Sequence, residues 1–385
     1  MALITAVHDA LVQLLGAAKV SAAAEVLASH AIDKWHASAL PEAVVFAEAT
    51  EDIVRVLQFA NERGIPVTTR GAGVGYVGGC VPGQGGIVLS VSRMTRILEL
   101  NPEDGVAVVQ AGVITGDLQD AARKVGWYYP PDPASLRECS LGGNIATNAG
   151  GPRCLKYGVT RPYVLGLEVV LADGSVLRCG SRCHKNKTGF DLVGLFVGSE
   201  GMLGVVSEAT LRLIPHPETR AMLTATFAEF PQAAQAVQRI LNSGHLPSAL
   251  EITDGFTLRA AREYLGPEYV IPVAVGQGEA GDVVVALAHE LRHGGALGGV
   301  RSSVHGERVP RAQDDSVLPF GHRVVHGVDA VRDLVDRPAV CRHCSSRLPR
   351  SSARRRRRRR PCGGPLTQPG AANTASAVSC AASCS

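Results

Sequence analysis

RGAGVGYVGG, from Arg70 to Gly79, decides the fold, because it continues from an expected strand at 66–70 and has five glycines among the nine residues Gly71–Gly79. Glycines leave backbone amides uncovered by side chains, so successive amides in such a loop converge on an anion, most simply a diphosphate. Arg70 adds positive charge at the edge of the loop. The alternative, a crowded loop that needs glycine only for its conformation, accounts less well for this glycine density.

The same loop matches the GxGxxG pattern of Rossmann domains in its letters only. In that fold a helix opens at the motif, so that its N-terminus faces the diphosphate. Here the chain continues as GCVPGQGG (Gly79–Gly86), which cannot begin a helix, and no acidic residue follows a second strand. The sequence therefore argues against a Rossmann domain.

Two further glycine-rich segments follow, SLGGNIATNAGG (Ser140–Gly151) and GSEGMLG (Gly198–Gly204). In the first of these, Asn and Thr side chains offer polar contacts without bulk. Three separated glycine-rich loops in one domain predict a long ligand lying across it.

The patterning between these segments predicts an α+β domain with many short strands. Thr50 is expected to cap a helix that ends at Gly64, with its apolar positions on one face. Further strands are expected at 41–46, 66–70, 87–90, 97–100, 106–110 and 203–213, and a second helix at 116–125, capped by Thr115. Residues 164–178 are expected to hold two strands joined by a tight hairpin at Ala172–Gly174. From residue 220, strands at 222–227, 249–252 and 269–275 alternate with helices at 231–241 and 255–265, as in a ferredoxin-like half-domain.

Length and composition limit the classes of protein to which this chain can belong. The 385 residues suffice for two domains, 45% of them are hydrophobic, and the net charge is only +4. No apolar run approaches the ~20 residues needed to span a bilayer. The first twenty residues lack a basic start and predict an amphipathic helix rather than a signal peptide, so a cytoplasmic protein is expected.

The composition changes after about residue 280. No Lys, Ile, Tyr, Trp or Met follows Ile271, and the seventeen basic residues from Asp282 onward are all Arg, including the run Arg354–Arg360. A nucleic-acid or nuclear-targeting tail, a disordered terminus and a coding sequence read in the wrong frame are the three interpretations. The absence of Lys favours the frame-shifted interpretation. Cys341-x-x-Cys344 supplies only half the ligands of a structural zinc site, so no metal site is expected.

Four segments together resemble a known family. They are RGAGVGYVGG (70–79), PPDPAS (130–135), SLGGNIATNAGGPRCLKYGVTRPYVLGLEVVLADG (140–174) and GFDLVGLFVGSEGMLGVVSEATLRL (189–213). In this order they are similar to the FAD-linked oxidases of the vanillyl-alcohol oxidase and p-cresol methylhydroxylase fold, in the branch of glycolate oxidase flavoprotein subunits and D-lactate dehydrogenases. The resemblance covers about residues 38–280.

The resemblance implies a domain order. An N-terminal helical segment (1–37) precedes an FAD-binding domain of the p-cresol methylhydroxylase type, with two small α/β subdomains (38–217). An incomplete ferredoxin-like cap or substrate domain (218–280) follows, and 281–385 is atypical, disordered or frame-shifted. FAD is expected to bind non-covalently, because covalent members use a His in the first loop where this chain has Val74.

The cofactor-binding residues implied by the resemblance lie in the first loop, the PPDPAS segment and the two later glycine-rich segments. They are Arg70, Gly71, Ala72, Gly73, Val74, Gly75, Gly78, Gly79, Pro131, Asp132, Ser135, Gly142, Gly143, Asn144, Thr147, Asn148, Gly150, Gly158, Gly204, Val205 and Val206.

The implied activity is oxidation of a 2-hydroxy acid, of the D-lactate or glycolate type, to the 2-oxo acid with hydride transfer to flavin. The family's later patterns Gly-His-x-Gly-Asp-Gly-Asn-x-His and Glu-His-Gly do not occur in this chain, so no catalytic residue is assigned. A partner electron-transfer subunit, or a quinone or cytochrome acceptor, is expected, and a nucleic acid is not. Two alternatives stay open: an FAD-binding but inactive product, and nucleic-acid binding through the Arg run.

Overall fold

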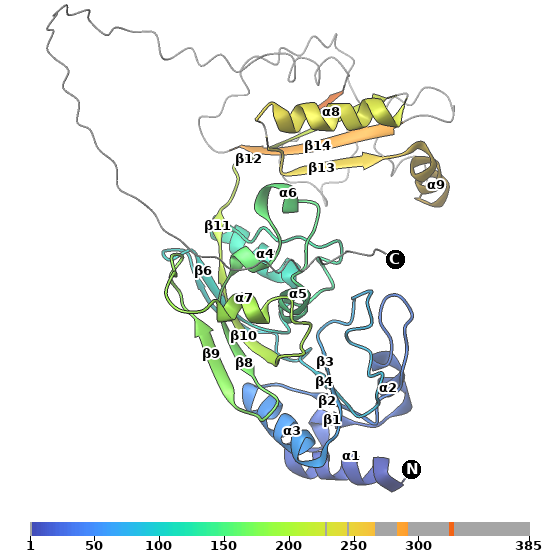
Figure 1. Ribbon diagram of the computed structural model, residues 1–385, viewed down its shortest axis with the longest axis vertical. Coiled ribbons are helices and arrows are strands. Elements are labelled where there is room, and N and C mark those ends of the chain that lie inside the picture. The colour runs from blue at the N-terminus through green and yellow to red at the C-terminus, as the bar shows by residue number, and fades with distance from the viewer. Residues whose placement is uncertain (1, 228, 245, 266–282, 292–322, 327–385) are drawn as a thin grey trace, which may run out of the picture. The chain divides into compact units, whose positions relative to one another are not determined.

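The structure is a computed structural model that describes residues 2–227, 229–244, 246–265, 283–291 and 323–326 (Figure 1). All of them belong to one compact unit of the chain, Met1–Pro338. They form three sheets of four or five strands and one small two-stranded sheet, β7 (Trp127–Tyr128) with β11 (Ile214–Pro215).

The first sheet has the strand order β1-β2-β4-β3, in which β4 pairs parallel with both β2 and β3 and β1 pairs antiparallel with β2. Its strands are β1 (Val20–Ser21), β2 (Ala43–Phe46), β3 (Val67–Arg70) and β4 (Ile87–Ser90), and its helices are α1 (Ala2–Leu15), α2 (Ala24–His30) and α3 (Thr50–Arg63). Helix α3 is the crossover between β2 and β3, as predicted. Its apolar positions Ile53, Val56, Leu57 and Ala60 are all buried.

The ends of α3 differ in how well the sequence predicted them. Gly64 ends the helix in the left-handed conformation, with φ 63°, as expected. At the other end, the prediction that Thr50 caps the helix is wrong. The carboxylate of Asp52 accepts hydrogen bonds from the backbone N–H groups of Glu48 (2.9 Å) and Ala49 (3.2 Å). Thr50 instead donates its hydroxyl proton to Glu168, at 2.7 Å.

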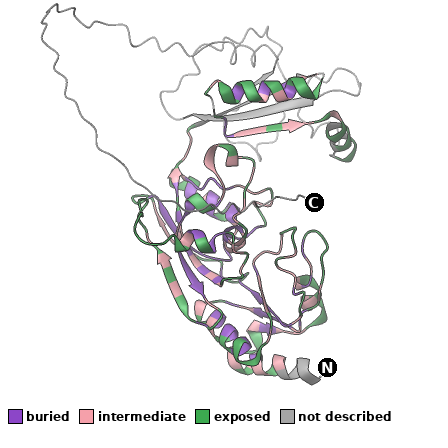
Figure 2. Ribbon diagram, viewed as in Figure 1, coloured by how far each residue is buried: buried purple, intermediate pink, exposed green. Residues whose placement is uncertain are grey.

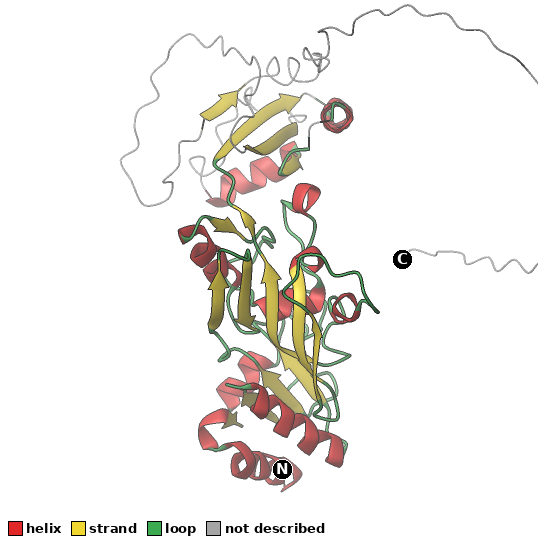
Figure 3. Cartoon of the chain, turned by 90° about the vertical axis from the view of Figure 1, so that its left-hand side faces the viewer, coloured by secondary structure: helices red, strands yellow, loops and turns green. Residues whose placement is uncertain are grey.

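The second sheet is antiparallel throughout, in the order β5-β6-β10-β8-β9. Its strands are β5 (Ile97–Asn101), β6 (Val106–Gln110), β8 (Val164–Val170), β9 (Val176–Gly180) and β10 (Val205–Arg212). Strand β10 alternates buried and half-buried residues, typical of a sheet with one covered face. Inner strands of both sheets are largely buried in Figure 2, and helices flank them in Figure 3.

The helices between β6 and β10 in the chain are α4 (Thr115–Lys124), α5 (Leu141–Thr147), α6 (Cys154–Tyr157) and α7 (Leu192–Phe196). Helix α5 corrects an expectation, because the sequence analysis treated its residues as a glycine-rich loop. The hydroxyl of Ser140 accepts a hydrogen bond from the N–H of Gly143 (3.3 Å) and begins the helix. Asn148 ends it with φ 50°.

The third sheet follows residue 218 and has the order β13-β14-β12-β15. It consists of β12 (Thr219–Phe227), β13 (Ala249–Thr253), β14 (Val283–Leu291) and β15 (Arg323–His326), with α8 (Phe230–Asn242) and α9 (Gly255–Leu265). Strand β14 pairs antiparallel with both β12 and β13. The third sheet therefore includes residues beyond 280, and the three consecutive valines of β14 favour a strand.

Several predictions for the C-terminal part fall outside the described residues. The strand expected at 269–275 is one of them. The others are the composition-based interpretations of 281–385, apart from the two strands β14 and β15.

Candidate functional site

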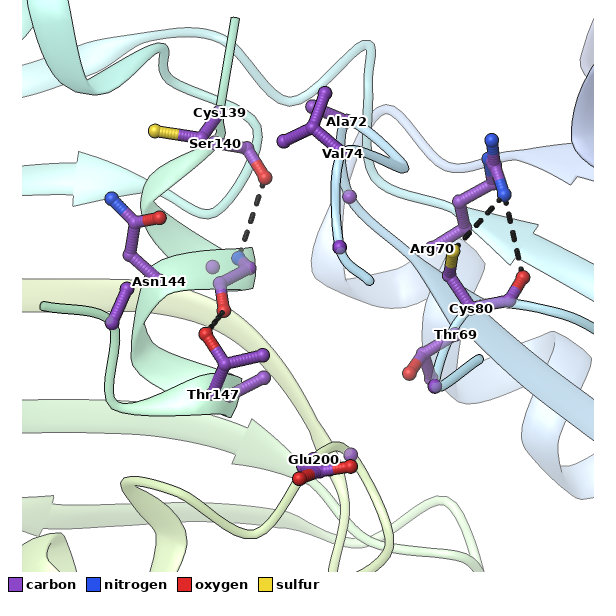
Figure 4. Close-up of a pocket in the computed structure, with 18 of the residues that line it drawn as sticks. Thr69, Arg70, Ala72, Val74, Cys80, Cys139, Ser140, Asn144, Thr147 and Glu200 are labelled. Carbon is purple, nitrogen blue, oxygen red and sulfur yellow. Dashed lines mark hydrogen bonds between the residues drawn. The ribbon is translucent and has the colours of Figure 1, made fainter. Parts of the chain in front are cut away.

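A cavity of about 450 Å³ is lined by residues of all three glycine-rich segments. Its walls come from the loop after β3, from α5 and its flanking residues, and from the turn before β10 (Figure 4). A volume of this size lies in the ordinary range of ligand pockets, ~300–1,000 Å³. Chain segments more than one hundred residues apart thus converge on one site.

The structure brings sixteen of the predicted cofactor residues to the wall of this cavity. They are Arg70, Gly71, Ala72, Gly73, Val74, Gly75, Gly79, Ser135, Gly142, Gly143, Asn144, Thr147, Gly150, Gly204, Val205 and Val206.

Three other predicted residues do not line the cavity and shape the backbone near it instead. The N–H of Gly78 donates to the carboxylate of Asp33, at 2.9 Å. Asn148 ends α5, and Gly158 ends α6 with φ 78°. The left-handed backbone conformations of Asn148 and Gly158 explain why asparagine and glycine occupy these two positions.

Pro131 and Asp132 also lie outside the cavity wall. The carbonyl of Pro131 accepts a hydrogen bond from the buried side chain of Gln119, at 2.9 Å. Asp132 forms an ion pair with Arg153, at 3.2 Å. Their neighbours Pro133, Ala134 and Ser135 line the cavity, so the segment contributes through its later residues.

Sequence reasoning missed sixteen lining residues, most of which stand beside predicted ones. They are Thr69, Tyr76, Val77, Cys80, Val91, Ala111, Pro133, Ala134, Cys139, Ser140, Ala146, Ala149, Phe196, Ser199, Glu200 and Gly201. Adjacency to a glycine-rich segment was a usable signal for most of them. Val91 and Ala111 carried no signal, because they follow strands whose position in space the sequence does not reveal.

Gly75 is a glycine of the first loop that protein packing does not explain. A Cβ atom built on Gly75 would meet no protein atom within 4 Å, and its φ is not left-handed. The protein fold itself therefore does not require glycine at this position. Because Gly75 lines the cavity, the space beside its backbone is open to a ligand.

Arg70 places a buried positive charge against this loop. The residue is 8% exposed. Its guanidinium donates to the carbonyl of Cys80 (3.4 Å), the sulfur of Cys80 (3.2 Å) and the carbonyl of Ser29 (3.4 Å), as Figure 4 shows for Cys80. It also packs beneath Gly73, where any side chain would collide with it. Within the described part of the chain, no carboxylate lies within 4 Å of Arg70.

The charge of Arg70 is not cancelled by the neighbouring thiol. Burial raises the pKa of the Cys80 thiol, the charge of Asp33 adds to this effect, and Arg70 opposes it. The thiol is therefore protonated at neutral pH. Since buried charges are normally paired, a guanidinium held only by neutral groups at a cavity wall is suited to an anionic ligand.

The opposite wall is fixed by hydrogen bonds around α5. The buried amide of Asn144 donates to the hydroxyl of Thr115, at 2.7 Å. The hydroxyl of Thr147 donates to the carbonyl of Gly143, at 3.0 Å. Gly142 packs so closely against Ala111 that an added Cβ would lie 2.7 Å from the alanine methyl. Gly142 thus allows the helix to approach Ala111, which follows β6 of the second sheet.

Two further searches cover only the residues with described structure. Among them, no group of three or more His, Cys, Asp or Glu side chains is arranged to hold a metal ion. No helix in the same residues is long and apolar enough to cross a membrane.

Comparisons with known proteins agree with the geometry. Residues 41–180 match the family described as FAD binding domain, and residues 216–290 match that described as FAD linked oxidases, C-terminal domain. These matches confirm the resemblance and the FAD-binding domain expected from the sequence.

The curated proteins that resemble this chain include glycolate oxidase subunits and D-lactate dehydrogenases. The glycolate oxidase subunit GlcD of Bacillus subtilis is 45% identical over 225 residues, which is 58% of this chain and 48% of that protein. A D-lactate dehydrogenase of Anaerostipes hadrus is 38% identical over 233 residues, covering 60% of this chain and 49% of that protein. The chain thus spans about half the length of the curated relatives it matches.

A solved structure supports the fold. An alkyldihydroxyacetonephosphate synthase superposes with a TM-score of 0.62 at 20% identity, over 76% of this chain and 56% of that one. The expected α+β architecture is confirmed.

Proposed function

We propose that this chain, which matches the families described as FAD binding domain and as FAD linked oxidases, C-terminal domain, binds FAD non-covalently and oxidises a 2-hydroxy acid of the D-lactate or glycolate type to the 2-oxo acid. One observation carries the proposal. The buried guanidinium of Arg70, with no carboxylate partner among the described residues, lies beneath a glycine loop whose open side faces the cavity. We assign 38–217 to the cofactor domain.

The residues present fit FAD. The amides of Gly71–Gly75 and the charge of Arg70 suit the diphosphate, which carries negative charge and accepts hydrogen bonds. The small residues of α5 and the apolar pair Val205 and Val206 suit a flat aromatic ring system. FAD, when bound, supplies a hydride acceptor for the carbon that bears the substrate hydroxyl.

The protein's own contribution is to bind, orient and exclude water. Oxidation of a 2-hydroxy acid also needs a cation for the substrate carboxylate and a base near the hydroxyl. We assign no described residue of the cavity to either role. The acceptor of the electrons is a second subunit, a quinone or a cytochrome, in line with a relative named as a subunit, and we place the chain in the cytoplasm.

We infer non-covalent binding from the residue at position 74 of the first loop. Val74 has no nucleophilic atom, whereas the cysteines Cys80 and Cys139 at the cavity wall do. Acid precipitation of the purified yellow protein should release all of the flavin into the supernatant. Flavin that remains in the pellet would contradict non-covalent binding and direct attention to the two cysteines.

Activity is tested on the full chain loaded with FAD. Anaerobic addition of glycolate or D-lactate should bleach the visible flavin absorption, and L-lactate should do so much more slowly. Bound flavin that none of these compounds reduces, although dithionite bleaches it, would show an FAD-binding but inactive protein.

A further inference from the structure

We propose that Asp33 is a positioning residue that holds the glycine loop in its ligand-binding conformation. Asp33 lies before residue 41, where the match to the FAD binding domain family begins. The inference rests on the proposed function, because it assigns to the N-terminal segment a part in the same cofactor site.

One carboxylate connects a tight turn to the loop. One oxygen of Asp33 accepts hydrogen bonds from the N–H groups of Trp35 (2.9 Å) and Ala37 (3.0 Å). The other oxygen accepts from the N–H of Gly78, at 2.9 Å. Asp33 is only 5% exposed, so these are charge-assisted hydrogen bonds sheltered from water.

A second hydrogen bond connects the same two segments. The N–H of Lys34 donates to the carbonyl of Gly75, at 3.0 Å. The turn thus holds the loop at Gly75 and at Gly78, on both sides of Tyr76 and Val77. The ring of Trp35 contacts the ring of Tyr76 edge to face, with centroids 6.1 Å apart. Gly75, Tyr76 and Val77 all line the cavity.

The backbone of the turn indicates that its shape is enforced. His36 has φ 66°, a left-handed conformation that costs free energy for a residue other than glycine. The backbone hydrogen bonds from Asp33 to Ala37 (3.2 Å) and from His36 to Asp33 (3.4 Å) close the turn around it. Such a conformation persists where several contacts determine it together.

The loop needs an external support because of its composition. Each glycine loses more conformational freedom on ordering than any other residue, and the loop has five. A ligand that must order the loop binds more weakly than one that finds it already ordered. By holding Gly75 and Gly78 before FAD arrives, the Asp33 turn lowers this entropic cost.

Asp33→Asn distinguishes the hydrogen bonds within the turn, to Trp35 and Ala37, from the hydrogen bond to the loop at Gly78. The asparagine oxygen still accepts from Trp35 and Ala37, but its NH₂ group cannot accept from the N–H of Gly78. We expect about tenfold weaker FAD binding, the size of one lost charge-assisted hydrogen bond. In the apoprotein, hydrogen exchange of the peptide Gly71–Cys80 should be faster. Asp33→Ala removes the hydrogen bonds to the turn as well as the one to the loop, and it should show the larger effect in both measurements.

Asp52→Asn is the matched control. Asp52 is also 5% exposed and also accepts two backbone N–H groups, but at the start of α3 and away from the cavity wall. This variant should lower the melting temperature and leave both the FAD dissociation constant and exchange in Gly71–Cys80 unchanged.

The outcomes are distinguishable. Wild-type FAD affinity and wild-type loop exchange in Asp33→Asn would overturn the inference, and so would equal effects of Asp33→Asn and Asp52→Asn. If the wild-type chain takes up no FAD, the proposed function fails. In that case, faster exchange in Asp33→Asn alone would still establish that Asp33 orders the loop, and unchanged exchange would refute it.

Discussion

The first and second glycine-rich segments have similar compositions and different structures. Residues 71–79 form an open loop, whereas Leu141–Thr147 form the helix α5. A side chain added at Gly75 would enter open space, whereas one added at Gly142 would collide with Ala111. Glycine density alone therefore does not identify a ligand-binding loop, because Gly75 leaves space for a ligand, whereas Gly142 allows close packing of a helix.

From this difference between the two segments, we expect the largest loss of FAD affinity from a substitution at Gly75. Gly75→Asp places a carboxylate where we propose a diphosphate, so FAD affinity should fall by about 100-fold or more from like-charge repulsion and steric exclusion. The dissociation constant is measured by quenching of flavin fluorescence.

Gly83→Asp is the control for this variant. Gly83 likewise has no neighbour within 4 Å and no left-handed φ, but it does not line the cavity. Its FAD affinity should match the wild type within about twofold, the scale of surface substitutions. Similar losses in both variants would remove Gly75 from the cofactor site.

The second prediction concerns packing in α5. Gly142→Ala should destabilise the protein by about 1–3 kcal/mol, because the new methyl overlaps Ala111. Gly143→Ala, one position along the same helix, meets only the Ser140 hydroxyl at 3.2 Å and gains helix propensity. Denaturant midpoints should separate the two variants, and equal midpoints would refute a packing role for Gly142.

The third prediction separates helix capping from ligand binding at Ser140. Ser140→Ala removes the hydrogen bond to Gly143 and should cost about 1 kcal/mol in unfolding free energy. Ser140→Asp restores a capping oxygen but adds negative charge at the cavity wall. It should regain stability and weaken FAD binding. Unimpaired FAD binding by Ser140→Asp would contradict an anionic ligand at this wall.

Glu168, on β8 of the second sheet, links that sheet to helix α3 beside the first sheet, because it accepts a hydrogen bond from Thr50. Burial opposes its ionisation, but hydrogen bonds from Thr50, Ser207 and Arg178 outweigh this and lower the pKa of Glu168. Its register partner Glu208 behaves oppositely, because burial and the charge of Glu168 raise the pKa of Glu208.

These opposite shifts predict opposite pH effects, each about 1 kcal/mol or less. Ionised Glu168 stabilises the fold above the unfolded-state pKa of about 4.3, and the contribution disappears as pH falls through its lower folded value. Ionised Glu208 destabilises the fold at neutral pH. At pH 7, Glu168→Gln should therefore lower the melting temperature and Glu208→Gln should raise it, with both differences shrinking below about pH 4. Differences of the same sign would contradict the assignment.

Local patterns predicted the parts of the fold that depend on neighbouring residues. The crossover from β2 through α3 to β3 follows from the spacing of Ile53, Val56 and Ala60 and from Gly64. Helix α5 escaped prediction because glycine and asparagine disfavour helices, and its stability comes from contacts with Thr115 and Ala111 that only the tertiary structure shows.

In the candidate site, too, only the parts with a local sequence pattern could be predicted. Its glycine-rich segments were visible as composition. Asp33 was not, because a single aspartate carries no motif and its partner Gly78 lies 45 residues further along the chain. Strand β14 was not predicted, because it lies in the part of the chain after residue 280 whose composition is atypical, although its three consecutive valines favour a strand.

The strand order of the third sheet also constrains the sequence of events during synthesis. Strand β14 lies between β12 and β13 but is translated after both, more than fifty residues beyond Phe227. At translation rates of about 5–20 residues per second, β12 waits several seconds on the ribosome without its central partner. During that interval its edge is open to pairing with other nascent chains, so chaperone binding to the growing chain is expected to peak between the emergence of β12 and that of β14.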